Sequence, residues 1–132
     1  MDNFSLRATA KTPEIILNSV TGEMRICGRS IPENADEFWN PILQWFYAYA
    51  SKPSPVTRLV INLEYFNITS SKRVLFLLYK MNEMNDSGHT VSVDWIYNEE
   101  DEDMLEAGKD FSSLVNIPFN LVKKKPVVQN ES

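Results

Sequence analysis

The chain of 132 residues has one cysteine, one histidine and four glycines, and each scarcity argues against a kind of chemical site. Cys27 cannot form an internal disulfide, and its strand-like surroundings favour a buried small apolar residue over a reactive thiol. His89 follows a turn, and no second histidine exists to activate a serine or cysteine nucleophile. The four glycines form no phosphate-binding loop. We therefore expect a protein that is not an enzyme and holds no cofactor.

Positive charge and long hydrophobic runs are also scarce. The formal net charge of −5 disfavours binding to nucleic acid or to an anionic membrane. The only basic cluster, residues 123–125, is interpreted as part of a solvated tail. No apolar run approaches the roughly 20 residues that a membrane span needs, and the first residues do not resemble a signal peptide. The composition predicts a soluble, cytoplasmic protein.

The hydrophobic and aromatic content is sufficient for one folded domain. Hydrophobic residues make up 43% of the chain and aromatic residues 11%. A domain of this length buries roughly two-thirds of the surface that its unfolded chain exposes. The polarity of the two ends predicts a flexible N-terminal arm at 1–11, a folded domain at 12–122 and a polar C-terminal tail at 123–132.

The hydrophobic pattern predicts alternating strands and helices. Two short apolar runs at 12–18 and 23–28, split by a turn containing Gly22, indicate a β-hairpin. Helices are expected before the proline-containing linker at 52–55, between residues 69 and 85, and around 104–114, with strands at 58–66, 90–97 and 118–122. The order β-β-α-β-α-β-α-β predicts an α/β fold with a mixed sheet and crossover helices. This layout resembles that of STAS domains, which bacterial anti-sigma-factor antagonists use.

The first helix has a start signal and an internal complication. Asn34 followed three residues later by Glu37 resembles a capping box. Pro41 either kinks a helix that has already begun or is the first residue of a helix capped by Asn40. One helical face is expected to carry the apolar side chains Phe38, Ile42, Trp45 and Tyr49.

The run at 58–66 is the clearest strand. Leu59, Ile61, Leu63 and Tyr65 should share one face, while Val60 and Phe66 should help to cover the other. A strand that is apolar on both faces is typical of the centre of a sheet.

The segment that follows this strand is the strongest candidate for a functional site. Short hydroxyl and amide side chains at the start of a helix accept bonds from free backbone N–H groups, which is the ordinary explanation for them. The same helix start also favours anions, so a phosphate on one of these hydroxyls would be well accommodated near Lys72 and Arg73. We predict a partner-binding segment that comprises Asn67, Ile68, Thr69, Ser70, Ser71 and Lys72.

An unbroken acidic run at 99–103 precedes the third helix. The run lacks the alternating ligands and central glycine of a calcium loop, so we predict no metal site. A solvated charged loop is the favoured interpretation, with a partner-binding patch as the alternative.

Several motifs, in their order and spacing, resemble the SiaC-type family of bacterial regulatory phosphoproteins, small STAS-like proteins that govern diguanylate cyclases. The similarity covers about residues 12–122. The motifs are Pro32-Glu33-Asn34-Ala35, Tyr65-Phe66-Asn67, Ser70-Ser71-Lys72, Trp95-Ile96-Tyr97, Met104-Leu105-Glu106-Ala107-Gly108, Asp110-Phe111 and Pro118-Phe119.

The resemblance implies a regulatory cycle. In the family, a serine/threonine kinase phosphorylates a threonine directly after the junction asparagine and a metal-dependent phosphatase removes the phosphate. The unmodified form binds and stimulates the cyclase that makes cyclic di-GMP. This chain departs from the pattern because Ile68 follows Asn67, which leaves Thr69 as the first choice of phospho-acceptor and Ser70 as the second. The alternative is a constitutive interaction module that is not phosphorylated.

Overall fold

The computed structural model describes residues 1–125 and contains one six-stranded sheet with three helices. The predicted mixed α/β domain is confirmed, with one strand more than the sequence indicated. In chain order the elements are β1 (Phe4–Leu6), β2 (Glu14–Leu17), β3 (Glu23–Ser30), α1 (Ala35–Ala50), β4 (Val56–Phe66), α2 (Ile68–Asp86), β5 (Thr90–Asn98), α3 (Glu102–Ser113) and β6 (Phe119–Lys124).

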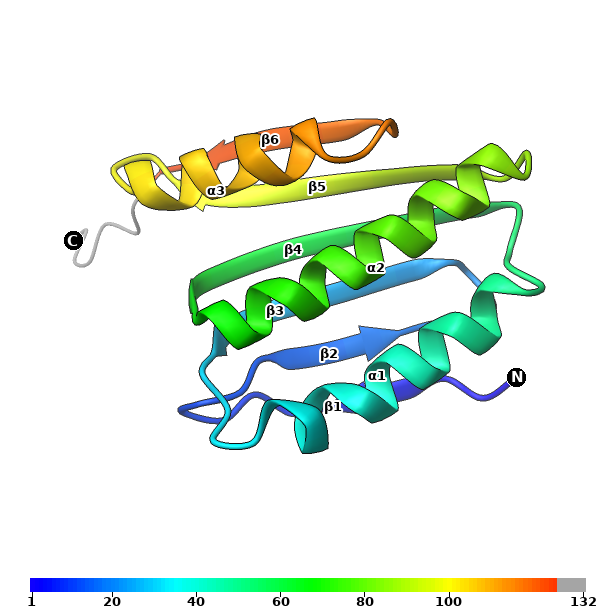
Figure 1. Ribbon diagram of the computed structural model, residues 1–132, viewed down its shortest axis with the longest axis horizontal. Helices are drawn as coiled ribbons and strands as arrows, with labels where there is room; N and C mark the ends of the chain where they lie inside the picture. Colours follow the sequence, from blue (N-terminus) through cyan, green and yellow to red (C-terminus); the bar gives the residue numbers. More distant parts are fainter. Residues whose placement is uncertain (126–132) are drawn as a thin grey trace, which may run out of the picture.

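The strands lie in the sheet in the order in which they occur in the chain. β1, β2 and β3 pair antiparallel, and β3, β4, β5 and β6 pair parallel. Each parallel connection advances by one strand in the same direction, so crossovers of one hand place all the helices on one face of the sheet. Figure 1 shows α1, α2 and α3 on the same side. The carboxyl ends of the four parallel strands therefore meet at one edge, and α2 and α3 both begin there.

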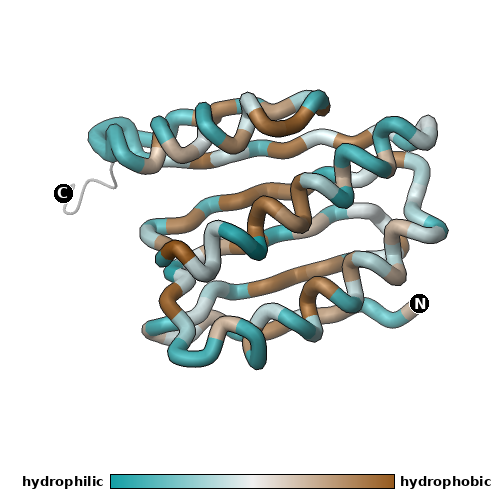
Figure 2. Tube along the Cα trace, viewed as in Figure 1, coloured by the Kyte–Doolittle hydropathy of each residue, from teal (hydrophilic) through white to brown (hydrophobic). Residues whose placement is uncertain are grey.

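The core lies between the sheet and the helices. β4 contributes Leu59, Ile61 and Leu63, which are almost completely buried. Figure 2 shows hydrophobic residues concentrated along the central strands and recurring along α1 and α2. The largest fully buried side chains are those of Trp39, Trp95, Tyr49 and Phe46. Packing of the helices on the sheet holds the strands in place, and the loops that follow the strands at the carboxyl edge are held with them.

Both ends of the predicted domain extend further than expected. Residues 1–11 are not a loose arm throughout, because β1 pairs with β2 and the indole N–H of Trp45 donates to the Asp2 carbonyl at 2.8 Å. At the other end, Lys123 and Lys124 belong to β6 and pair with Tyr97 and Asn98. The remainder of the predicted tail lies mostly outside the described residues. The sheet therefore includes a three-residue strand at one end and two lysines at the other, neither of which the hydrophobic pattern indicated.

The first helix begins where the capping signal places it but turns a slightly different face inward. The Asn34 side chain accepts a bond from the Glu37 backbone N–H at 3.1 Å, and Pro41 lies inside the helix on its exposed side. The fully buried positions are Trp39, Ile42, Phe46 and Tyr49, whereas Phe38 and Trp45 are only partly buried. Because Phe38 and Trp39, like Trp45 and Phe46, are adjacent aromatic residues, the sequence of α1 is compatible with two overlapping apolar faces. Packing against the sheet buries the face that contains Trp39 and Phe46.

Candidate functional site

A β-bulge near the end of β4 changes which side chains face the core. Gly28 on β3 pairs with Leu63 and the next residue, Arg29, pairs with Tyr65, so Glu64 is an extra residue on β4. Such a bulge breaks the alternation of side chains along a strand. Tyr65, predicted to share a face with Leu63, is 53% exposed, whereas Leu63 is buried. Phe66 turns inward, with its ring 6.1 Å from that of Trp95.

Asn67 caps α2 directly after the bulge. Its backbone is extended, and its side-chain oxygen accepts bonds from the Ser70 N–H at 2.9 Å and from the Thr69 hydroxyl at 3.0 Å. The Asn67 backbone N–H donates to the Ser30 carbonyl at 3.1 Å, which ties the cap to the end of β3. The capping explanation of this asparagine is therefore correct, and the cap also holds the Thr69 hydroxyl in place.

Ser70 belongs to the core rather than to the surface. Its side chain is fully buried, its hydroxyl lies 2.7 Å from that of Ser30, and it donates to the Ser30 carbonyl at 3.1 Å. The indole N–H of Trp39 donates to the Ser70 hydroxyl at 3.4 Å. Neither a kinase nor a partner protein can reach this side chain in the folded state, so its role is to lock the start of α2 onto β3 and α1.

The other members of the predicted segment lie at the surface. Ile68 is 77% exposed, and Thr69 and Lys72 are exposed too. Ser71 is half-buried, and its hydroxyl donates to the Ile68 carbonyl at 2.8 Å. A large exposed aliphatic side chain at the start of a helix gains nothing from the chain's own core, and it is available to another molecule.

Arg73 connects the start of α2 to the start of α1. Its guanidinium donates to the Thr69 carbonyl at 3.1 Å and pairs with the carboxylate of Asp36. The sequence placed Arg73 near a phosphate at this helix start but gave no sign of Asp36, because that contact joins residues on two different helices. A positive group therefore lies one turn from Thr69.

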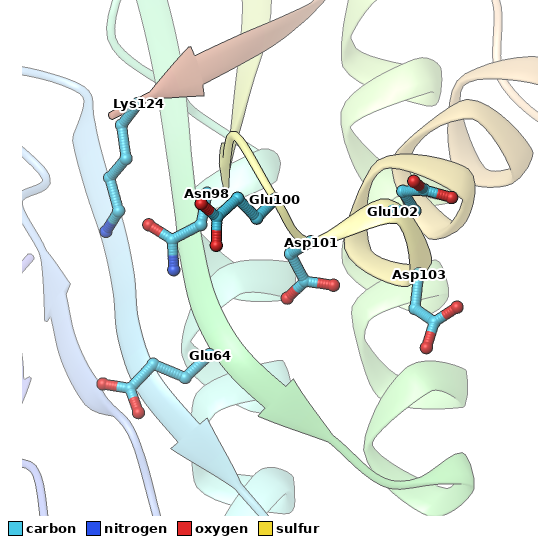
Figure 3. A pocket seen from close by; sticks show the side chains of 7 residues that line it. All are labelled: Glu64, Asn98, Glu100, Asp101, Glu102, Asp103 and Lys124. Atoms are coloured by element: carbon cyan, nitrogen blue, oxygen red, sulfur yellow. The ribbon is translucent and has the colours of Figure 1, made fainter. Parts of the chain in front are cut away.

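A concave region beside the junction combines apolar and acidic side chains, and we call it the acidic hollow. Its volume is about 320 Å³, and it continues into a wider depression of about 800 Å³ that shares the carboxylates of Glu64, Asp101 and Asp103. Figure 3 shows these carboxylates coming from β4 and from the start of α3, with Glu100 and Asn98 beside them. The acidic hollow is lined by Glu64, Tyr65, Phe66, Asp101, Asp103, Met104 and Ala107. Neither Glu64 nor Tyr65 was predicted as a site residue, because a regular strand places Tyr65 on the same face as Leu63 and the bulge cannot be seen in the sequence.

The residues of the acidic run take two different roles. Asp101 caps α3 by accepting a bond from the Met104 N–H at 3.0 Å, while Glu102 and Asp103 lie in the first turn, where negative charge is favourable. Within residues 1–125 no group of three or more His, Cys, Asp and Glu side chains is placed to hold a metal ion. Cys27 is partly exposed rather than buried as expected. No helix in the same range is both long and apolar enough to cross a membrane.

A family model that matches most of the chain shows which family the protein belongs to. Residues 6–124 match the model of the SiaC family regulatory phosphoproteins. The chain belongs to this family. An uncharacterized protein of Pseudomonas aeruginosa (strain UCBPP-PA14) is 26% identical over 119 residues, which cover 90% of this chain and 94% of that protein.

Solved structures of the SiaC family share the fold. SiaC of Pseudomonas aeruginosa superposes with a TM-score of 0.87 at 24% identity, covering 94% of this chain and all of that one. The crystal structure of the diguanylate cyclase SiaD in complex with its activator SiaC, from the same organism, also matches. The TM-score is again 0.87, at 25% identity over 92% of this chain and 99% of that one. The resemblance to the SiaC family and the predicted fold are thus confirmed.

Proposed function

We propose that this protein binds and stimulates a diguanylate cyclase through the β4–α2 junction, and that phosphorylation of Thr69 releases the cyclase. The carrying observation is that Ile68, at 77% exposure, stands beside the exposed Thr69 on a capped helix start. The family supports a regulatory role, and one solved SiaC is described as the activator bound to a diguanylate cyclase. On this proposal the chain is a regulator and not itself an enzyme.

The charge of a phosphate provides the switch. A phosphothreonine adds roughly −1.5 to −2 charges at neutral pH. At Thr69 this charge would be stabilised by the helix N-terminus, and Lys72 and Arg73 are cations close by in the chain. Burying the same charge in an apolar contact around Ile68 would be costly. The phosphorylated form is therefore stable by itself but a poor partner.

The cycle requires two further partners. A serine/threonine kinase must reach the Thr69 hydroxyl, which is exposed but held by Asn67 at 3.0 Å. A metal-dependent phosphatase must then remove the phosphate. Of the two acceptors predicted from the sequence, Thr69 is the one we retain, because the Ser70 hydroxyl is buried.

A constitutive interaction module is the second candidate. The observation in its favour is Ile68 itself, which has no hydroxyl and follows Asn67 directly, the position that the family resemblance assigns to the phospho-acceptor. On this alternative Ile68 provides a permanent apolar contact, and the Thr69 hydroxyl serves only the cap of α2.

Binding to the cyclase of the same organism separates the two candidates. We expect Thr69→Glu to weaken binding and, as a result, to lower the production of cyclic di-GMP by the cyclase. Thr69→Val should leave both the binding and the production unchanged. Incubation with the cognate kinase should add one phosphate to the wild type and none to Thr69→Val. Equal binding by wild type and Thr69→Glu, with no phosphate incorporated, would establish the constitutive module.

Shortening the Ile68 side chain tests the docking surface for both candidate functions. Ile68→Ala should weaken the complex about tenfold, because exposed apolar anchors at interfaces contribute of the order of 1–2 kcal/mol. The matched control is Val20→Ala, which shortens another highly exposed aliphatic side chain, 79% exposed, in the turn before β3. A wild-type protein that neither binds nor stimulates the cyclase would refute the proposed function.

A further inference from the structure

The acidic hollow combines an apolar floor with an acidic rim. Its floor is apolar, with Phe66, Met104 and Ala107 beside the 53% exposed ring of Tyr65. Its rim carries the carboxylates of Glu64, Asp101 and Asp103. The bulge in β4 creates this combination, because it turns Tyr65 to the surface next to Glu64.

The rim carboxylates have no ion-pair partner within the described part of the chain. The ion pairs formed by residues 1–125 include neither Glu64 nor any residue of the run 99–103. The neighbouring cation, Lys124, directs its ammonium group to the Asn62 side chain at 3.1 Å. A concave surface lined by charges of one sign concentrates the field and attracts the opposite charge.

We infer that the acidic hollow is a docking surface for a protein segment in which lysine or arginine side chains flank an aromatic or aliphatic side chain. This inference rests on the proposed docking of the cyclase at the same edge and adds the chemistry of the docked segment. The apolar side chain would cover Tyr65 and the partly buried Phe66, and the basic side chains would meet Glu64 and Asp103. Tyrosine is among the residues that most often dominate binding at interfaces.

The alternatives fit the surface less well. Nucleic acid and anionic lipid are repelled by the carboxylates. A single cation would leave the apolar floor uncovered, and the carboxylates among residues 1–125 are not placed to hold one. Only a chain with alternating basic and apolar side chains uses both features.

Paired charge substitutions test the inference. The edge variant is Glu64→Gln with Asp103→Asn. Its matched control, Glu83→Gln with Asp86→Asn, makes the same two changes at exposed positions near the other end of α2. We expect the edge variant to bind the cyclase about tenfold more weakly at low salt, with a smaller salt dependence, and the control to stay within about twofold.

Further measurements complete the design. Tyr65→Ala should weaken the complex about tenfold at both low and high salt, because it removes an apolar anchor rather than a charge. A helical 14-residue peptide of leucine and lysine serves as an independent probe, with a leucine–glutamate peptide as its control. The wild type should bind the basic peptide several times more tightly than the edge variant does. Thermal melting of each variant verifies that it is folded.

Each outcome decides one claim. If the cyclase binds the edge variant as well as the wild type, the inference is overturned and the proposed function stands. Equal losses in the edge and control variants would show an effect of net charge alone and would also overturn it. If the cyclase does not bind the wild type, the proposed function fails. The inference is then tested by the leucine–lysine peptide, and equal affinities of this peptide for the wild type and the edge variant would overturn it. Stabilisation by Ca²⁺ or Mg²⁺ that the edge variant loses would replace it with a cation site.

Discussion

The hydroxyl oxygens of Ser30 and Ser70 lie 2.7 Å apart with both side chains fully buried. Ser30 ends β3 and Ser70 lies in the first turn of α2, so this contact fixes the helix start against the neighbouring strand. The carbonyl of Ser30 also accepts from the Asn67 N–H at 3.1 Å. Ile68 and Thr69, the exposed residues between Asn67 and Ser70, are therefore held in place by contacts with β3 on both sides.

Removal of the Ser70 hydroxyl should destabilise the protein. Ser70→Ala leaves the Trp39 indole N–H and the Ser30 hydroxyl without their partner in the core, which costs about 1–3 kcal/mol. The free energy of unfolding from urea titration measures this. Ser71→Ala is the control, since its hydroxyl is only half-buried, and we expect a change within about 0.5 kcal/mol. Equal stabilities of the two variants would contradict the proposed lock.

The bulge in β4 predicts opposite consequences for two adjacent aromatic residues. Phe66 packs against Trp95 and Phe111, with ring centroids 6.1 Å and 6.2 Å apart, so Phe66→Ala should cost about 2–4 kcal/mol of stability. Tyr65→Ala should cost less than about 1 kcal/mol, because that ring is largely in solvent. Unfolding of both variants in urea checks the prediction. A larger loss in Tyr65→Ala would mean that side chains alternate along β4 without a bulge.

Gly108 allows α3 to approach β5 and β6 closely. A Cβ atom at this position would lie 2.5 Å from Cδ1 of Trp95 and 2.7 Å from Cδ2 of Leu121. Gly108→Ala should therefore lower the stability by about 1–3 kcal/mol, although alanine favours helices, because the overpacking outweighs the gain in propensity. Thermal unfolding measures the change. An increase in melting temperature would show that the helix can move away without loss.

A network on the sheet face that carries no helix predicts a dependence on pH. Burial alone would raise the pKa of Asp94, but bonds donated by Asn120 at 2.9 Å and by Arg58 at 2.5 Å outweigh it and lower the pKa below its usual value. A lowered pKa in the folded state stabilises the protein at pH values above the unfolded pKa of about 3.9. That contribution is lost as the pH falls through the folded pKa.

Asp94→Asn should therefore cost about 1 kcal/mol at pH 7 and much less at pH 3. The measurement is the difference in the free energy of unfolding between wild type and variant at the two pH values. Glu23→Gln is a suitable control, because its contact with Arg58 is longer, at 3.4 Å, and more exposed. An Asp94→Asn effect that stays constant between pH 7 and pH 3 would rule out the ionised carboxylate as its source.

Local signals predicted a large part of the site. The short polar side chains after a strongly hydrophobic strand located the start of α2, and Asn67 caps it as those side chains indicated. The family resemblance ranked Thr69 ahead of Ser70, but local signals could not show which of the two hydroxyls is buried, because both residues lie at a helix start. Only the packing of Ser70 against Ser30 and Trp39 separates a buried hydroxyl from an exposed one.

The sequence by itself determined the order of the elements from β2 onward, the hairpin, the caps at Asn34 and Asn67, and the family, since each depends on neighbours in the chain and on the period of the hydrophobic pattern. Tertiary structure decided the rest. The weakly hydrophobic ends joined the sheet because β2 and β5 offered them unpaired backbone groups, and α1 chose its inward face by docking on the strands. The exposure of Tyr65 followed from one extra residue opposite β3, a pairing between segments more than 30 residues apart that no local pattern encodes.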